Sequence, residues 1–312
     1  MSDLRARSLS IVGAALVLMF YSELFFLNDG PTKTVTDILT RPSAAAVELL
    51  ELTTYYAFFA WGLLLVLPYA ERLGLAGIIL AGCIFGWVTE GTIIPIVYEA
   101  PPISWVWPSI SWHAMVDVLL GLFIVRFAMR RLGCVALALL FTTMGIAWGV
   151  WATWTWGEPT MPRLSPAVFL FFACTSAAIW LGGMALLDRS GPWQATRPEK
   201  WGIAGVTVAL GLLMATAGLP FSVGIMVIAG ATWWLLVRKS ERLSESDWRL
   251  PSGPVRLTTY GLTLIVPATA SVTYWLVWTN GWHIPIEEVA GLAMIAGALV
   301  FFWAIWRAFT TR

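Results

Sequence analysis

The chain has 312 residues, of which 59% are hydrophobic and 12% charged, with a net charge of +1 and a mean hydropathy of +0.78. Soluble domains carry about 25% charged residues, so half that share, together with long apolar stretches, excludes a soluble globular fold. The near-neutral charge gives no indication of nucleic-acid binding, and no lysine or arginine cluster suggests a binding patch, so we expect no nucleic-acid partner. The composition therefore predicts an integral membrane protein.

The N-terminal segment carries Arg5 and Arg7, followed by an apolar run that ends in YSELFFLND (21–29). A secretory signal has the same order of charge and apolar residues, but it also needs a small-residue cleavage site. The sequence shows no such site here. We therefore expect this segment to be retained as the first membrane helix.

Ten apolar stretches are long enough to cross a hydrocarbon core of about 30 Å at about 1.5 Å per residue. The predicted spans are 8–28, 43–69, 74–98, 109–129, 133–156, 164–187, 201–217, 220–237, 257–279 and 285–307. The polar segment 238–256 connects the eighth and ninth spans and is too short to be a domain. The expected fold is all-α and polytopic, with residues 1–312 forming one transmembrane domain.

The distribution of basic residues predicts the orientation of these ten spans. With the N-terminus in the cytoplasm, 16 of the 19 lysines and arginines fall in cytoplasmic segments or adjoining helix ends, and only Lys33, Arg41 and Arg163 fall outside. Cytoplasmic loops are enriched in basic residues. We therefore expect a multi-pass protein of the plasma (inner) membrane with both termini in the cytoplasm.

The acidic residues follow the opposite pattern, since 11 of the 18 lie in outer loops or in outer helix ends, against three bases. A negative potential of this kind attracts cations and repels free anions. Besides the lipid bilayer itself, the expected ligand is a lipid-phase or cationic small molecule.

The stretch TEGTIIPIVYEAPPISWVWPSISWHAMVD (89–117) gathers ionisable groups in apolar surroundings. Glu90 lies eight residues before Tyr98, the predicted outer end of the third helix, so it is about 12 Å deep. Asp117 lies about 10 Å inside the fourth helix, and Glu51 is at a similar depth in the second. Consecutive helices are usually neighbours, so the three carboxylates are predicted to meet in one outward-facing site.

Helical spacing adds neighbours to this site. His113 and Asp117 are four residues apart and share a helix face, as do Glu51 and Tyr55. A charge at this depth costs about 2.5–3.5 kcal/mol, which favours a functional role over packing. The residues expected to be catalytic are Glu51, Glu90, His113 and Asp117. The residues expected to bind substrate are Glu48, Tyr55, Tyr98 and Trp112.

Two chemistries fit the four catalytic candidates. Neighbouring carboxylates resist simultaneous ionisation, and a protonated acid beside an ionised one can perform acid–base catalysis. The same four side chains, Glu51, Glu90, His113 and Asp117, also offer oxygen and nitrogen ligands to a divalent metal ion, which is the one cofactor that the sequence leaves open. The chain has no HExxH or GxSxG motif, and its two histidines cannot form a three-histidine metal site.

Three classes of function stay open. A polar pocket on one side of the membrane favours an intramembrane enzyme that acts on a lipid-phase substrate. A cation- or proton-coupled transporter needs polar groups on both halves of its pathway, and the run VPATASVTY (266–274) is where an unwound segment would lie. A sensor or an assembly subunit of a membrane complex is the third class.

Overall fold

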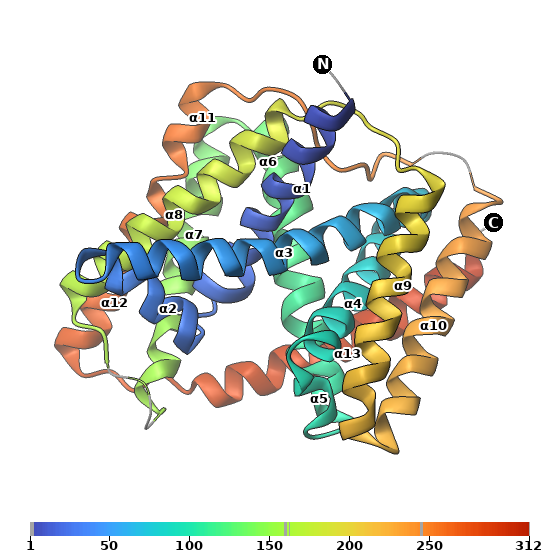
Figure 1. The fold of residues 1–312 in the computed structure, drawn as a ribbon. Helices are drawn as coiled ribbons and strands as arrows, with labels where there is room; N and C mark the ends of the chain where they lie inside the picture. The colour runs from blue at the N-terminus through green and yellow to red at the C-terminus, as the bar shows by residue number, and fades with distance from the viewer. Residues whose placement is uncertain (1–2, 159–160, 162, 244–245, 312) are drawn as a thin grey trace. The chain divides into compact units, whose positions relative to one another are not determined.

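The computed structural model describes residues 3–158, 161, 163–243 and 246–311, and all regular secondary structure within these residues is helical (Figure 1). The chain divides into two compact units. Unit 1 comprises Met1–Ala57, Ile124–Gly191 and Ser252–Ala290, and unit 2 comprises Phe58–Phe123, Pro192–Pro251 and Gly291–Arg312. The expectation of one domain over 1–312 stays a prediction.

Unit 1 is built from α-helices, a short π-helix and two 3₁₀ turns. These are α1 (Asp3–Met19), η1 (Phe20–Leu24), α2 (Asp29–Thr36), η2 (Asp37–Leu39), α6 (Val125–Arg131), α7 (Cys134–Trp151), η6 (Ala152–Trp156), α8 (Pro166–Arg189), α11 (Leu257–Leu262) and α12 (Ile265–Asn280). Two longer helices, α3 (Pro42–Ala70) and α13 (Ile286–Thr310), contribute residues to both units.

The core of unit 1 combines close helix contacts with stacked aromatic rings. A methyl group on Gly13 of α1 would lie 2.9 Å from the Gly183 carbonyl oxygen of α8, so the missing side chains let these two helices approach closely. Phe20 stacks on Trp180 and meets the ring of Trp148 edge-on, with ring centroids 5.1 and 5.4 Å apart. All three rings are fully buried. Their large apolar area stabilises the packing of η1 against α7 and α8.

Unit 2 contains the predicted proline-rich loop and the helices on either side of it. Its elements are η3 (Glu71–Leu73), α4 (Gly74–Thr92), η4 (Pro95–Tyr98), α5 (Ile103–Val106), η5 (Ser109–Ile124), α9 (Arg197–Ala215), η7 (Thr216–Gly218) and α10 (Phe221–Ser240). The first three residues of the predicted connector 238–256 belong to α10. Further along the connector, the Leu250 amide donates to Glu71 Oε1 at 2.7 Å, so this segment packs against η3.

Local sequence signals set several helix ends. Thr196 and Glu199 form a reciprocal capping box at the start of α9, in which each side chain accepts a hydrogen bond from the backbone amide of the other. Gly281 ends α12 in the left-handed conformation, with φ of 62°, which glycine adopts without steric cost. Gly74, with φ of 64°, separates η3 from α4.

Eight stretches of the described residues are long and apolar enough to cross a membrane. They are Asp3–Leu24, Pro42–Thr92, Ile103–Arg131, Cys134–Trp156, Pro166–Arg189, Phe221–Ser240, Leu257–Asn280 and Ile286–Thr310. The stretch Pro42–Thr92 contains α3 and α4, which correspond to two predicted spans. The seventh predicted span corresponds to α9, a helix that is not among the eight. The helical membrane fold is thus supported, whereas the count of ten spans and their orientation stay predictions.

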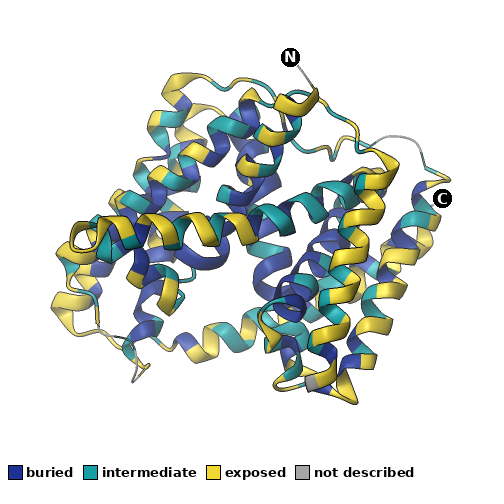
Figure 2. Ribbon diagram, viewed as in Figure 1, coloured by how far each residue is buried: buried dark blue, intermediate teal, exposed yellow. Residues whose placement is uncertain are grey.

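Helix α13 shows the surface that a membrane-embedded helix needs. Only 11% of its most apolar window is buried within the protein, and apolar side chains such as Leu299 and Phe302 are exposed along it (Figure 2). Large exposed apolar surfaces mark contact with lipid or another apolar partner. The exposed apolar side chains of α13 therefore fit the membrane-embedded helix that its apolar sequence predicts.

Candidate functional site

Three residues at four-residue spacing define one face of α4, namely Gly82, Gly86 and Glu90. A Cβ atom on Gly82 would lie 2.8 Å from the Ala114 Cα atom, and one on Gly86 would lie 2.0 Å from the Ser109 carbonyl oxygen. Both distances are shorter than real Cβ contacts. The two glycines therefore let α4 approach η5 closely, and Glu90, one turn further along, meets η5.

His113 lies between two carboxylates at the centre of a buried chain of side chains. Its Nε2 atom is 2.6 Å from Glu90 Oε1, and its Nδ1 atom is 2.7 Å from Asp117 Oδ2. The three residues Glu90, His113 and Asp117, which we call the buried triad, are 7%, 3% and 0% exposed. His113 and Asp117 belong to the π-helical segment η5, and π-helical turns occur frequently at functional sites.

The hydrogen-bond pattern sets the smallest number of protons that the buried triad can hold. A carboxylate has no proton to donate, and a neutral imidazole has a single N–H. The two short contacts therefore need two protons between them. An imidazolium between two carboxylates meets this need, and so does a neutral imidazole with one carboxylate and one protonated acid. With two protons the negative groups exceed the positive ones by one in both arrangements, and the triad is then a single anion.

Glu90 Oε2 is the end of the triad at which a further proton can bind. This oxygen is buried and has no hydrogen-bond partner among the described residues. An intramembrane charge costs about 2.5–3.5 kcal/mol even on the lenient insertion scale, which makes the buried triad a candidate functional site. The Phe85 ring packs edge-on against the His113 imidazole, with centroids 5.9 Å apart, and adds apolar surroundings.

The predicted site residues of the second span, Glu48, Glu51 and Tyr55, all lie in unit 1. Glu51 is exposed on α3, and Tyr55 is 48% exposed. Glu48 accepts a hydrogen bond from the Thr34 hydroxyl at 2.7 Å and lies 3.7 Å from the Arg41 guanidinium. The joining of Glu51 to the buried triad stays a prediction, and so does substrate binding by Glu48 and Tyr55.

Tyr98 and Trp112 flank the proline-rich loop of unit 2. The Tyr98 hydroxyl donates to the Gly91 carbonyl oxygen at 3.1 Å, which ties η4 to the end of α4. Burial raises the pKa of Tyr98 above its ordinary value, so this hydroxyl stays a neutral donor. Trp112 is buried in η5 and meets Trp107 edge-on, with ring centroids 6.1 Å apart. These contacts hold the loop, and a role in substrate binding stays a prediction.

The triad already engages both ring nitrogens of His113, which bears on the predicted metal site. Within the part of the chain that the structure describes, no group of three or more His, Cys, Asp or Glu side chains is placed to hold a metal ion. Both ring nitrogens of His113 already face carboxylate oxygens. The imidazole would have to leave one of these oxygens before it could ligate a divalent metal.

Another buried carboxylate lies in unit 1 and is not among the predicted site residues. Glu23 on η1 accepts a hydrogen bond from the Tyr56 hydroxyl at 2.6 Å and another from the Asn28 amide at 2.6 Å. The Tyr56 hydroxyl also lies 2.6 Å from the Ser22 hydroxyl. Both Glu23 oxygens are thus satisfied, which fits a structural role. Glu23 and Tyr56 are 33 residues apart, so no local spacing signals their contact.

A buried ion cluster in unit 1 is another feature that sequence reasoning missed. Arg126, which is 1% exposed, lies 3.0 Å from Asp188 Oδ1, and Arg130 contacts the same oxygen. The Tyr260 hydroxyl donates to Asp188 Oδ2. The separation of 58 residues between Arg130 and Asp188 hides this pairing from local spacing.

Comparison of the chain with known protein families, with curated proteins and with solved structures finds no match. The class of protein is therefore defined by the fold and the site alone. The chain is a tryptophan-rich helical protein with several apolar helices of membrane-crossing length. It carries a carboxylate–imidazole–carboxylate chain inside its second compact unit.

Proposed function

We propose that the protein is an intramembrane enzyme whose buried triad performs acid–base chemistry on a lipid-phase substrate. One observation carries the proposal: Glu90 Oε2 is a buried carboxylate oxygen without a hydrogen-bond partner among the described residues, at one end of a chain that can share protons. In this role Glu90 is the general base. His113 and Asp117 orient it and share its charge.

The charge balance of the triad suits this role. When Glu90 Oε2 takes a proton from the substrate, the triad changes from a single anion to a neutral group. The negative charge passes to the substrate, and return of the proton restores the original charges of the triad and of the substrate. The contact between Glu90 Oε1 and His113 Nε2 persists throughout, so the base does not have to move. General acid–base catalysis of this kind contributes about 10²–10⁴-fold to a rate.

A proton-coupled transporter is the second candidate, and the burial of the triad favours it. All three residues are at most 7% exposed, and a proton reaches such a site more easily than a bulky substrate does. In this case Glu90 is loaded with a proton from one side of the membrane and unloaded to the other, as intramembrane carboxylates do in proton relays.

The test compares the wild type with Glu90→Gln, which keeps the size of the side chain but removes the proton-binding oxygen. Glu99→Gln is the matched control, because Glu99 is an exposed glutamate of the same unit. Each protein is reconstituted with a total lipid extract of the source cells, and the lipids are compared by mass spectrometry. We expect at least one compound to be converted by the wild type and by Glu99→Gln, but not by Glu90→Gln.

A second assay separates the two candidates. The same variants are placed in proteoliposomes with a pH gradient and an internal pH-sensitive dye. If the pH gradient dissipates only when Glu90 is present, and no compound is converted, the protein is a transporter and not an enzyme. If neither conversion nor proton flux depends on Glu90, both candidates are wrong.

A further inference from the structure

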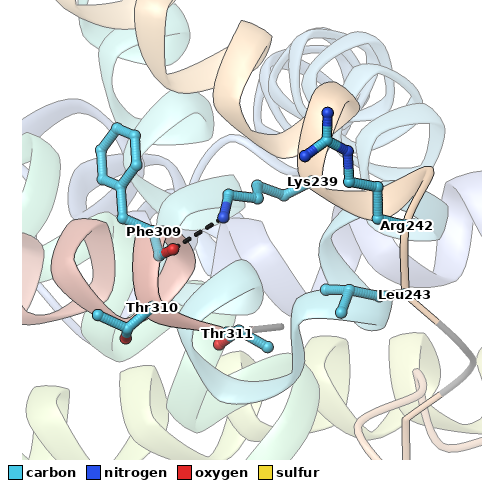
Figure 3. A pocket seen from close by; sticks show the side chains of 6 residues that line it. All are labelled: Lys239, Arg242, Leu243, Phe309, Thr310 and Thr311. Carbon is cyan, nitrogen blue, oxygen red and sulfur yellow. Dashed lines mark hydrogen bonds between the residues drawn. The ribbon is translucent and has the colours of Figure 1, made fainter.

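A polar pocket lies where the ends of α10 and α13 come together in unit 2 (Figure 3). The Lys239 ammonium reaches across it and donates to the Phe309 carbonyl oxygen at 2.8 Å. The volume of the pocket is about 580 Å³. The residues that line it are Lys239, Arg242, Leu243, Phe309, Thr310 and Thr311.

The charge of this pocket is positive. Two of its six lining side chains are cationic and none is acidic. The ends of α10 and α13 each add a partial negative charge of roughly −0.5, which together offset only about one of the two positive charges. The Lys239 ammonium has three N–H donors, and the contact with Phe309 uses one of them. The Arg242 guanidinium provides further donors for an anion, whereas the Thr310 and Thr311 hydroxyls donate to backbone carbonyl oxygens of α13.

The polar pocket continues into a smaller apolar one of about 140 Å³, which shares Lys239, Arg242 and Phe309 with it. Its other lining residues include Trp234, and the side chains of Trp234 and Phe309 are both 58% exposed. Exposed apolar residues continue from there along α13, for example Trp306 at 57%. A cationic pocket thus opens directly onto apolar surface of the kind that faces lipid.

We propose that this pocket binds the phosphate headgroup of an anionic phospholipid in the leaflet on the predicted cytoplasmic side. Arg242 pairs with the phosphate oxygens through its planar guanidinium, and Lys239 adds a point charge. The acyl chains lie against Trp234 and Phe309. Basic pockets between membrane helices on the cytoplasmic side suit anionic lipid headgroups, whereas a free phosphate gains nothing from the adjoining apolar groove.

The test measures lipid binding by native mass spectrometry and by thermal unfolding of the detergent-solubilised protein. Phosphatidylglycerol, phosphatidylcholine and inorganic phosphate are added separately. We expect phosphatidylglycerol to raise the unfolding temperature and to bind at least tenfold more tightly than either of the others. Arg242→Gln should remove this tenfold preference. Arg189→Gln, which removes an exposed arginine of unit 1 outside the pocket, should leave it unchanged.

The variants Arg242→Gln and Trp234→Ala keep the test decisive. Lys239→Gln removes a cap of α13 and can lower stability by itself, whereas Arg242→Gln leaves that hydrogen bond intact. Trp234→Ala shortens the apolar groove. It should weaken the binding of phosphatidylglycerol without altering the change in unfolding temperature that inorganic phosphate causes. The proposal is overturned if phosphatidylcholine binds as tightly, if inorganic phosphate stabilises as much, or if Arg242→Gln and Arg189→Gln bind phosphatidylglycerol equally.

Discussion

Replacing Gly86 by alanine should break the buried triad without touching any of its three members. The new Cβ atom would lie 2.0 Å from the Ser109 carbonyl oxygen, and real Cβ atoms essentially never come within 3.0 Å of another atom. Helices α4 and η5 must therefore separate by at least about 1 Å, because a backbone carbonyl cannot turn aside as a flexible side chain can. Glu90 lies one turn beyond Gly86, so it moves with α4.

The expected magnitude follows from this displacement. A separation of about 1 Å stretches the contact between Glu90 Oε1 and His113 Nε2 from 2.6 Å to about 3.6 Å, beyond a hydrogen bond. Loss of a hydrogen bond to a charged group costs about 1.5–3 kcal/mol. Overpacking of the interface costs about 1–3 kcal/mol as well. A misplacement of about 1 Å at a catalytic group can lower a rate by about 10²-fold.

The His113 imidazole can be observed directly, because the chain has only two histidines. His283 is exposed, so a tag-free His283→Gln background leaves His113 as the single histidine in an NMR spectrum. In this background the protons that lie in the two short hydrogen bonds of His113 give far-downfield signals. We expect Gly86→Ala to remove the signal of the proton between His113 Nε2 and Glu90 Oε1 and to lower the unfolding temperature, measured by the intrinsic fluorescence of the tryptophans.

Gly205→Ala is the matched control for this substitution. Gly205 lies within α9 of unit 2, and no atom lies within 4 Å of an added Cβ. Alanine there should be neutral or stabilising by about 0.4–1 kcal/mol. If Gly86→Ala keeps the His113 signals and the unfolding temperature of the parent protein, the close approach of α4 and η5 does not hold the triad, and the reasoning fails.

Three further predictions concern the triad, the ion cluster of unit 1 and the topology. His113→Gln should lower any Glu90-dependent conversion or proton flux at least tenfold, about 1.4 kcal/mol, and a silent substitution would remove His113 from the site. Asp188→Asn leaves the buried Arg126 and the partly exposed Arg130 without their shared carboxylate and should cost about 3–5 kcal/mol of stability in a denaturant titration. Asp3→Asn, at an exposed ion pair, should barely change stability, and equal effects of the two would contradict this account. In a cysteine-free background, Lys33→Cys should react with an impermeant reagent in intact cells, whereas Arg242→Cys should react only after permeabilisation. Labelling of Arg242→Cys in intact cells would refute the orientation.

The contacts that sequence reasoning missed all join residues that lie far apart along the chain. The pairing of Glu23 with Tyr56 joins residues 33 apart, and the pairing of Arg130 with Asp188 joins residues 58 apart. Local spacing cannot report such contacts, because they depend on which helix faces turn toward each other. One signal was available, however. The spacing of Gly82, Gly86 and Glu90 marks a small-residue face that leads directly to a carboxylate.

The helical membrane character and the candidate triad were readable from the sequence, because both depend on local properties. Hydropathy over a window reports segment length and polarity, and the spacing of His113 and Asp117 places them on one helix face wherever that helix packs. The position of Glu90 along the third predicted span placed it at about the same membrane depth as Asp117. Only the tertiary structure decided that Glu90 bonds to His113, and that Glu51 is exposed on α3. The physical reason is that rotation and approach of helices are set by side chains from distant segments, here by two glycines that let α4 and η5 nearly touch.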